Sequence, residues 1–526
     1  MYVIITLTLF LLAALSMIGL RLSRSLAPYS WLAATLGSLL AWVSVLIWQL
    51  KLPQHISPSA WLPSTLFSAS PMLFVDSYAW LYALCLAALA SAVLLTSPAR
   101  TAIAINPAAW VGTLAITTLG ILAVLADNPL TLVLVWSAID LFEFFNTLQA
   151  SDSASLSERS VVAFFLRSAG TGIALWAIIV ASSTNGQPFF FENVPFQSGI
   201  FLLLATGLRL GVLPLHVTFR NEPVLRRGFG TILRLTTAAS SLILLARLPF
   251  NAIDSIYTPV LLGFAATTAL YNGWRWLRAP DALSGRPYWI IGMSSLSLAA
   301  ALRGSSAGSA AWGAAMILFG GISFLYSARQ ARFSIVLAGL GILLLGLPLS
   351  LTASGWDGSF RWPALFWTLF LAALLMLVVG YIAHILKPGE SSFTDLPAWT
   401  RASYPLGLAL LALTAITVGI WGWAGAMQLG TWLAAFISSA VLILFGLASW
   451  RLGIISRVRL AVSSTPNMTS RFNDMQDFMV KIFWATFRSA GGLLNYTASL
   501  LEGAGGLLWT LVLLVLLFSI LRSPLP

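Results

Sequence analysis

The stretch GLRLGVLPLHVTFRNEPVLRRGFGTILRLTTAASSLILLAR, from Gly207 to Arg247, decides how this chain folds. It joins two apolar runs of membrane-spanning length, near 197–217 and 229–246, and each run carries an arginine, Arg209 or Arg234. A helix needs about 20 mostly apolar residues to cross a bilayer. A charge at the bilayer centre costs at least about 2.5–3.5 kcal/mol, so it indicates a functional or pairing role. The stretch therefore predicts two transmembrane helices with buried charge.

A proline and a histidine lie between these two arginines. Pro214 follows Arg209 by five residues, and because proline lacks a backbone N–H, it bends or breaks its helix. A broken span beside buried charge is typical of an ion pathway. His216 lies at the end of the same span. Its imidazole titrates near physiological pH and could pass protons into the membrane; the alternative is a histidine that only hydrogen-bonds at the interface.

The rest of the 526 residues continues this apolar pattern. Hydrophobic residues make up 59% of the chain and charged residues 8%, whereas soluble proteins carry about 25% charged residues. This composition excludes a cytosolic enzyme, a nucleic-acid binder and a disordered chain. The net charge of +12 comes from single basic residues in short loops, which is typical of an orientation signal. The only cysteine, Cys85, permits neither a disulfide framework nor a cysteine metal site.

Sixteen apolar runs have spanning length, and the expected fold class is all-α integral membrane with 14–16 transmembrane helices. They lie near 2–20, 29–49, 77–97, 107–126, 129–149, 160–183, 197–217, 229–246, 256–274, 287–302, 307–328, 333–353, 362–386, 402–424, 429–449 and 505–521. Odd-numbered connections hold 20 Lys and Arg residues and even-numbered connections hold 4. The positive-inside rule then places both termini outside the cytoplasm of a cell inner (plasma) membrane.

Five charged residues remain inside the spans. Asp140 and Glu143 lie in span five, three residues apart, and so share one helical face. Arg167, Arg209 and Arg234 lie in spans six, seven and eight. One interpretation is a static buried ion-pair network, and the other is a proton path in which arginines only bias their neighbours, because arginine keeps its proton. In either case Asp140 or Glu143 is expected within ion-pairing reach of Arg209.

The stretch from Gly207 to Arg247 resembles the core of the antiporter-like membrane subunits found in respiratory complex I, the proton-translocating NADH-quinone oxidoreductase, and in Mrp cation/proton antiporters. The family pattern runs Gly-Lys, then Phe-Pro-Leu-His, a loop, an Ala/Thr-rich helix and Leu-Leu-Ala-Arg. Arg209 falls on the family's helix-seven lysine, and Pro214, Leu215 and His216 match its Pro-Leu-His.

The first half departs from the family pattern at two acidic positions. In the segment from Asp127, Trp136 matches the family's Trp-Glu pair, but Ser137 replaces the glutamate and Asp140 follows one turn later. The segment FFLRSAG resembles the family's Phe-Phe-x-Arg-x-x-Asp, with Gly170 in place of the acid.

The second half departs further. The segment AWGAAMILFGGISFLYSAR, residues 311–329, lacks the histidine and lysine of the family's helix eleven, and Trp356 replaces a lysine after the Gly-Leu-Pro-Leu-Ser segment around Pro348. Between Arg286 and Trp356 there is no Lys, His, Asp or Glu, and the arginines there (Arg286, Arg303, Arg329 and Arg332) are placed in connections. The family's lysine relay is therefore not expected in this half.

The resemblance implies an antiporter-like fold with two inverted five-helix repeats and broken helices at Pro214 and Pro348. The predicted regions are 1–106 with helices one to three, 107–250 as the first repeat, 251–386 as a degenerate second repeat, 387–450 with helices fourteen and fifteen, and 451–526 with an amphipathic interfacial segment and the last span.

The function implied is that of a membrane subunit in a complex I-like or Mrp-like proton-translocating complex, with a degenerate proton path. Its partners would be other membrane subunits and the lipid bilayer, without nucleic acid. The alternative function is that of a non-conducting scaffold subunit of such a complex. The third hypothesis is an independent transporter for a small solute. The sequence predicts no catalytic residue, metal site or cofactor of its own, so an enzyme class could come only from the complex.

Overall fold

The computed structural model describes residues 2–22, 29–57, 70–100, 107–150, 154–185, 189–216, 227–359, 363–387, 389–427, 435–441 and 443–444, with a few single helical residues beyond them. The chain divides into two compact units, residues 1–451 and 452–526. The description below concerns the first unit. The predicted span 505–521 and the predicted amphipathic segment lie almost wholly outside the described residues, as does much of the span 429–449.

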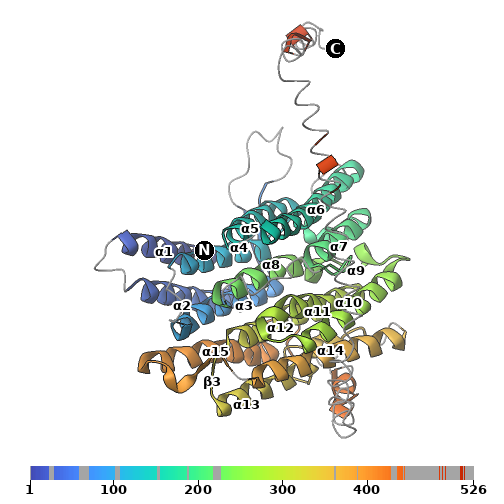
Figure 1. The fold of residues 1–526 in the computed structure, drawn as a ribbon. Helices are drawn as coiled ribbons and strands as arrows, with labels where there is room; N and C mark the ends of the chain where they lie inside the picture. The colour runs from blue at the N-terminus through green and yellow to red at the C-terminus, as the bar shows by residue number, and fades with distance from the viewer. Residues whose placement is uncertain are drawn as a thin grey trace. The chain divides into compact units, whose positions relative to one another are not determined.

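The first unit is a bundle of helices lying side by side (Figure 1). The helices are α1 (Tyr2–Leu22), α2 (Ser30–Trp48), α3 (Ser77–Thr96), α4 (Pro107–Leu125), α5 (Pro129–Gln149), α6 (Ala154–Asn185), α7 (Phe196–Leu210), α8 (Arg227–Arg247), α9 (Phe250–Ile253), α10 (Thr258–Arg278), α11 (Ala282–Leu302), α12 (Ser306–Leu325), α13 (Ala331–Leu340), α14 (Ala364–Leu386) and α15 (Ala398–Ile420). Two short strand pairs connect them: β1 (Gln54–Ile56) with β2 (Leu73–Val75), antiparallel, and β3 (Ala328–Arg329) with β4 (Ser391–Ser392), parallel.

Ten of the described helices are long and apolar enough to cross a membrane. Each of the first fourteen predicted spans contains a helix, so the chain is an all-α, multi-pass membrane protein. Helix α3 lies in the interior, because every residue from Ala79 to Thr96 is buried and the helix packs on α2, α4, α8, α12 and α15. Helices α8 and α12 pack on each other beside α3.

Two helices end early, near the two prolines predicted to break them. Helix α7 ends at Leu210, where Gly211 adopts the left-handed conformation with φ 75°, and turns lead past Pro214. Helix α13 ends at Leu340, and a 3₁₀ turn continues it to Leu345. Beyond that turn, the backbone around Pro348 is irregular.

Arg286 does not lie in a connection, contrary to the sequence prediction. The prediction started span ten at Pro287, but a capping box between Asp281 and Ser284 starts α11 at Ala282. The reciprocal bonds of a capping box satisfy backbone donors at the helix start, so this start is favoured over a later one. Arg286 is consequently the fifth residue of the helix and is fully buried. Arg303, Arg329 and Arg332 lie at or beyond helix ends, or in the first turn of α13.

Candidate buried charge network

The two acids of α5 point into the bundle from one face. Helix α5 begins after Asn128, whose side chain accepts a hydrogen bond from the backbone of Thr131, with Pro129 at its first position. Both features favour a helix start at that point. The side chains of Asp140 and Glu143 follow about one turn apart and are 2% and 0% exposed. Carboxylates buried to this degree require charged or hydrogen-bonding partners.

Arg209 of α7 is the partner of Asp140, as expected. Its Nη1 donates to Oδ2 at 2.6 Å and its Nη2 donates to Oδ1 at 2.9 Å, which is the bidentate geometry that makes arginine–carboxylate pairs strong. The same guanidinium donates to Thr171 Oγ1 at 2.8 Å and to Ser241 Oγ at 3.3 Å. Its Cζ lies 4.2 Å from the ring centroid of Trp136, within the range of a cation–π contact. Arg209 is therefore held from several sides.

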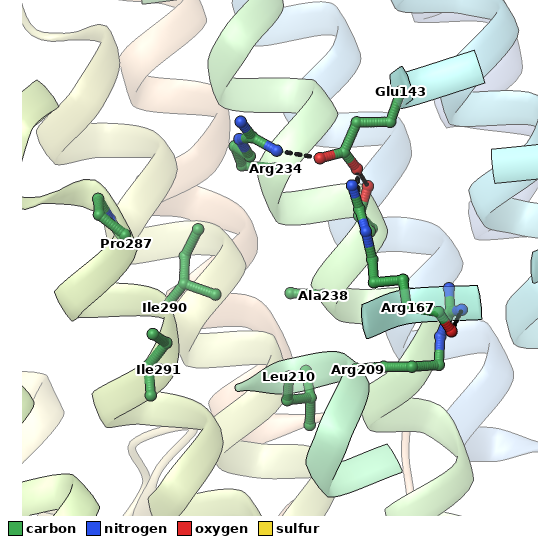
Figure 2. Close-up of a pocket in the computed structure, with 10 residues that line it drawn as sticks. Glu143, Arg167, Arg209, Leu210, Arg234, Ala238, Pro287, Ile290 and Ile291 are labelled. Carbon is green, nitrogen blue, oxygen red and sulfur yellow. Dashed lines mark hydrogen bonds and ion pairs between the residues drawn. The ribbon is translucent and has the colours of Figure 1, made fainter. Parts of the chain in front are cut away.

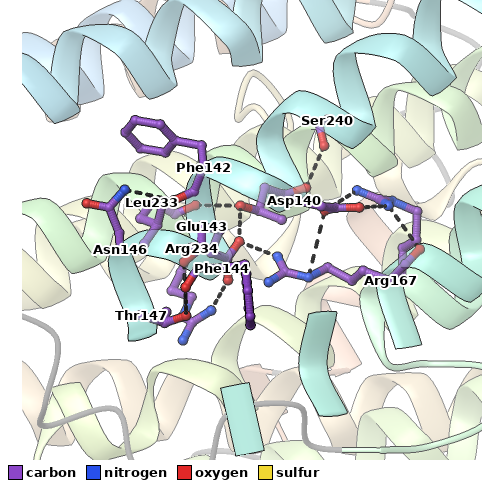
Figure 3. Close-up of polar contacts among 12 residues, drawn as sticks. Asp140, Phe142, Glu143, Phe144, Asn146, Thr147, Arg167, Leu233, Arg234 and Ser240 are labelled. Atoms are coloured by element: carbon purple, nitrogen blue, oxygen red, sulfur yellow. Dashed lines mark hydrogen bonds and ion pairs between the residues drawn. The ribbon is translucent and has the colours of Figure 1, made fainter. Parts of the chain in front are cut away.

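Glu143 pairs with two other arginines. Arg167 of α6 donates to its Oε2 and Arg234 of α8 donates to its Oε1. Thr237, one turn after Arg234, donates to Oε2 at 2.6 Å. Figure 3 shows Arg167 between the two acids, and its Nε also lies 3.8 Å from Asp140 Oδ1. The five charges thus form one connected network across α5, α6, α7 and α8.

A small cavity adjoins this network. The space that water-sized molecules can occupy is about 50 Å³, enough for a few waters at roughly 10–15 Å³ each. One side is lined by polar groups of the network, among them Glu143, Arg209 and Arg234. The opposite side is lined by Pro287, Ile290 and Ile291 of α11 (Figure 2). The side that the second half contributes to this cavity is therefore apolar.

Among the described residues, neither histidine of the predicted spans has a hydrogen bond to the five charges of the network. His216 is buried, and its Nδ1 lies 2.9 Å from the carbonyl oxygen of Pro214; among the described residues no side chain pairs with it. His384 of α14 is also buried, with 1% exposed. Its Nε2 lies 2.9 Å from the carbonyl oxygen of Trp276, which ties α14 to α10.

Comparisons with known proteins identify the fold. The chain is similar to a chain in the structure of the Mrp complex from Dietzia sp. DQ12-45-1b, with a TM-score of 0.66 and 16% identity over 100% of this chain. The chain has the antiporter-like fold. It spans 64% of the length of that Mrp chain. This chain is also similar to a chain of the membrane-bound sulfane sulfur reductase, an archaeal respiratory membrane complex, with a TM-score of 0.64, 14% identity and coverage of 98% of this chain and 99% of that one.

No family model matches the chain, and no curated protein matches its sequence. The two solved structures confirm the resemblance noted in the sequence at the level of the antiporter-like fold.

Sequence reasoning found all five charges of the network but missed the polar side chains that complete it. Thr237 lies three residues after Arg234 and Thr171 lies four residues after Arg167, spacings that place side chains on one helical face. A search for hydroxyl residues at this spacing from each buried charge would have found both. Ser241 was not recoverable in this way, because it lies seven residues after Arg234, outside this spacing.

Proposed function

We propose that this chain is a membrane subunit of a complex I-like or Mrp-like ion-translocating complex, with a degenerate proton path. The observation that carries the proposal is the connected network of Asp140, Glu143 and three arginines inside an antiporter-like fold. Buried ionisable groups in membrane helices are costly and mark ion or proton routes. Both similar structures are named as complexes, and the second is named as a respiratory membrane complex; this supports other membrane subunits as partners.

In this proposal the acids of α5 are the proton-exchanging groups. Asp140 and Glu143 change charge on protonation, and His216 near the end of α7 would connect them to the cytoplasm. The arginines hold the acids in place but do not relay a proton. The region 107–250 would be the active first repeat, and 251–386 would be its inverted, degenerate counterpart.

A scaffold that moves no ion is the second candidate, and one observation favours it. The guanidinium of Arg209 donates to Asp140 twice and also to Thr171, Ser241 and the backbone of Arg167. A pair held by so many bonds resists the separation that proton exchange requires. A subunit of this kind would pack between conducting partners and stabilise the assembly.

The deciding experiment is ion transport by the reconstituted complex carrying Asp140→Asn and Glu143→Gln together. Glu158→Gln is the matched control, because Glu158 lies on α6 with an exposed side chain. A conducting subunit predicts a loss of transport in the double variant at equal incorporation, with no loss in the control. Undiminished transport would establish the scaffold instead. Ser294→Ala and Ser323→Ala on α11 and α12 are expected to leave transport unchanged.

We also propose that both termini face away from the cytoplasm, since the odd-numbered connections carry most basic residues. Burial of Arg286 in α11 takes one residue from that count and leaves the asymmetry intact. A reporter that works only in the cytoplasm, fused after Pro526, is expected to be inactive. An active reporter would reverse the orientation.

A further inference from the structure

The side chain of Arg209, from α7, lies against one face of α6, and the α6 residues that it contacts have a helical spacing. Arg167, Gly170 and Thr171 stand at positions i, i+3 and i+4, which share a face of a helix. Arg209 Nη1 donates to the backbone oxygen of Arg167 at 3.2 Å and to Thr171 Oγ1 at 2.8 Å. The two outer residues therefore supply acceptors, and the side chain of Arg209 lies across the third, Gly170.

At Gly170 there is no space for a side chain. A Cβ atom there would lie 2.6 Å from Cγ of Arg209, 3.4 Å from its Cδ and 3.0 Å from the backbone oxygen of Ala205. Carbon atoms in favourable contact are about 3.5–4.0 Å apart. The Cγ atom cannot move aside freely, because the guanidinium beyond it is bonded to Asp140, Thr171 and Ser241.

A second glycine on the same helix provides the contrast. Gly172 follows Gly170 by two residues in α6. A Cβ atom at Gly172 would meet no atom within 4 Å. Position 170 therefore has no room for a side chain, whereas position 172 has.

We propose that Gly170 is a positioning residue for the Arg209–Asp140 pair. The missing side chain at 170 lets arginine at 209 lie along α6 and reach the carboxylate with two bonds. Any side chain at 170 displaces the guanidinium and leaves Asp140 buried without its bidentate partner. Positions 170 and 209 are consequently coupled: glycine at the first is the condition for arginine at the second.

The test is a double-mutant cycle on thermal unfolding of the purified full chain. Gly170→Ala and Gly172→Ala are each made in the natural chain and in a background with Asp140→Asn and Arg209→Ala. In the natural chain, Gly170→Ala is expected to lower the Tm by about 3 °C or more, since it breaks a buried ion pair. Gly172→Ala is expected to leave the Tm unchanged or raise it, because alanine favours helix over glycine.

In the background without the pair, the effect of Gly170→Ala is expected to fall by at least half, since only the contact with the Ala205 carbonyl remains. If Gly170→Ala lowers the Tm equally in both backgrounds, the proposal is overturned. It is also overturned if, in the natural chain, Gly170→Ala changes the Tm as little as Gly172→Ala does. If Gly170→Ala does not fold in the natural chain, its recovery in the pair-free background supports the coupling and its failure in both contradicts it. An experimental structure of Gly170→Ala gives an independent answer: two retained bonds between Arg209 and Asp140 would also overturn the proposal.

The link to ion transport rests on the proposed function and has its own readout. In proteoliposomes with the complex, Gly170→Ala is expected to change the pH profile of transport, and Gly172→Ala is not. The proposed function is refuted if transport is unchanged in all three variants: Gly170→Ala, Gly172→Ala, and Asp140→Asn together with Glu143→Gln. That outcome would leave the coupling measured by the unfolding cycle intact.

Discussion

Helices α5–α8 and helices α10–α14 differ in most of the side chains that they bury, although Arg286 of α11 is also fully buried. The first group buries five charges that pair across four helices. The second group buries aromatic rings: Trp276 and Trp289 have ring centroids 5.4 Å apart, and Trp289 and Tyr381 have centroids 6.1 Å apart. Polar atoms of these rings bond to backbone carbonyls, as in the bond from Trp289 Nε1 to the oxygen of Met316 at 3.1 Å.

The aromatic rings also occupy space where a side chain of α12 would lie. A Cβ atom at Gly320 would be 2.7 Å from Trp289 Nε1. The indole of Trp289 therefore packs closely against α12, a helix without any titratable residue. From this comparison we expect the stability of the first group to depend on charge pairing and the stability of the second group to depend on the volume of its buried rings.

The largest effect is expected from removing the carboxylate shared by two arginines. Glu143→Ala leaves Arg167 and Arg234 buried without it, and removing one partner of a buried pair costs about 3–5 kcal/mol. We expect a loss above about 5 kcal/mol, seen as little or no folded protein in the membrane. Glu158→Ala on the exposed face of α6 is the control. Normal yield of Glu143→Ala would show that the network contributes no stability.

The next effect tests the aromatic core. Trp289→Ala removes a fully buried indole, and such truncations cost about 3–5 kcal/mol because a cavity remains. Trp399→Ala, at a site 53% exposed, is expected to change the free energy of unfolding by less than about 1 kcal/mol. Equal losses in denaturant unfolding of the two variants would contradict the assignment of α10–α14 as a volume-dependent core.

The third effect in size is expected from removing a single hydroxyl group of the charge network. Thr237→Val deletes the bond to the Glu143 carboxylate, and a hydrogen bond to a charged group is worth about 1.5–3 kcal/mol. We expect a loss in that range by denaturant unfolding. Thr267→Val on α10 is the control, because its hydroxyl bonds only to its own helix on the exposed face. A loss no greater than the control's would mean that Thr237 is not part of the network.

The smallest effect is expected in the aromatic core. Tyr381→Phe deletes a neutral bond of 3.2 Å to the oxygen of Leu337 and keeps the ring, so we expect a loss of about 0.5–1.5 kcal/mol. Tyr257→Phe, at an exposed site, is the control. A loss larger than that of Thr237→Val would reverse the contrast between the two regions.

Several features of the site were predictable because each depends on one segment of the chain. Membrane insertion acts on the apolar length and the charge of a single span. For this reason, the sequence identified Asp140, Glu143 and three arginines as the buried charges, and the structure brings all five together. The early start of α11 was missed, because the prediction followed the apolar run from residue 287, whereas the capping box that begins the helix is formed by two polar residues, Asp281 and Ser284.

By itself, the sequence determined that this is a multi-pass helical membrane protein and which charges must find partners inside it. Only the tertiary structure decided which partner each charge has: Asp140 pairs with Arg209 in two bonds, and Glu143 is shared by Arg167 and Arg234. Pairing depends on the rotation and register of neighbouring helices, which are set by side chains far apart in sequence. For the same reason, only the structure shows why position 170 is glycine: the atom that excludes a side chain there belongs to another helix.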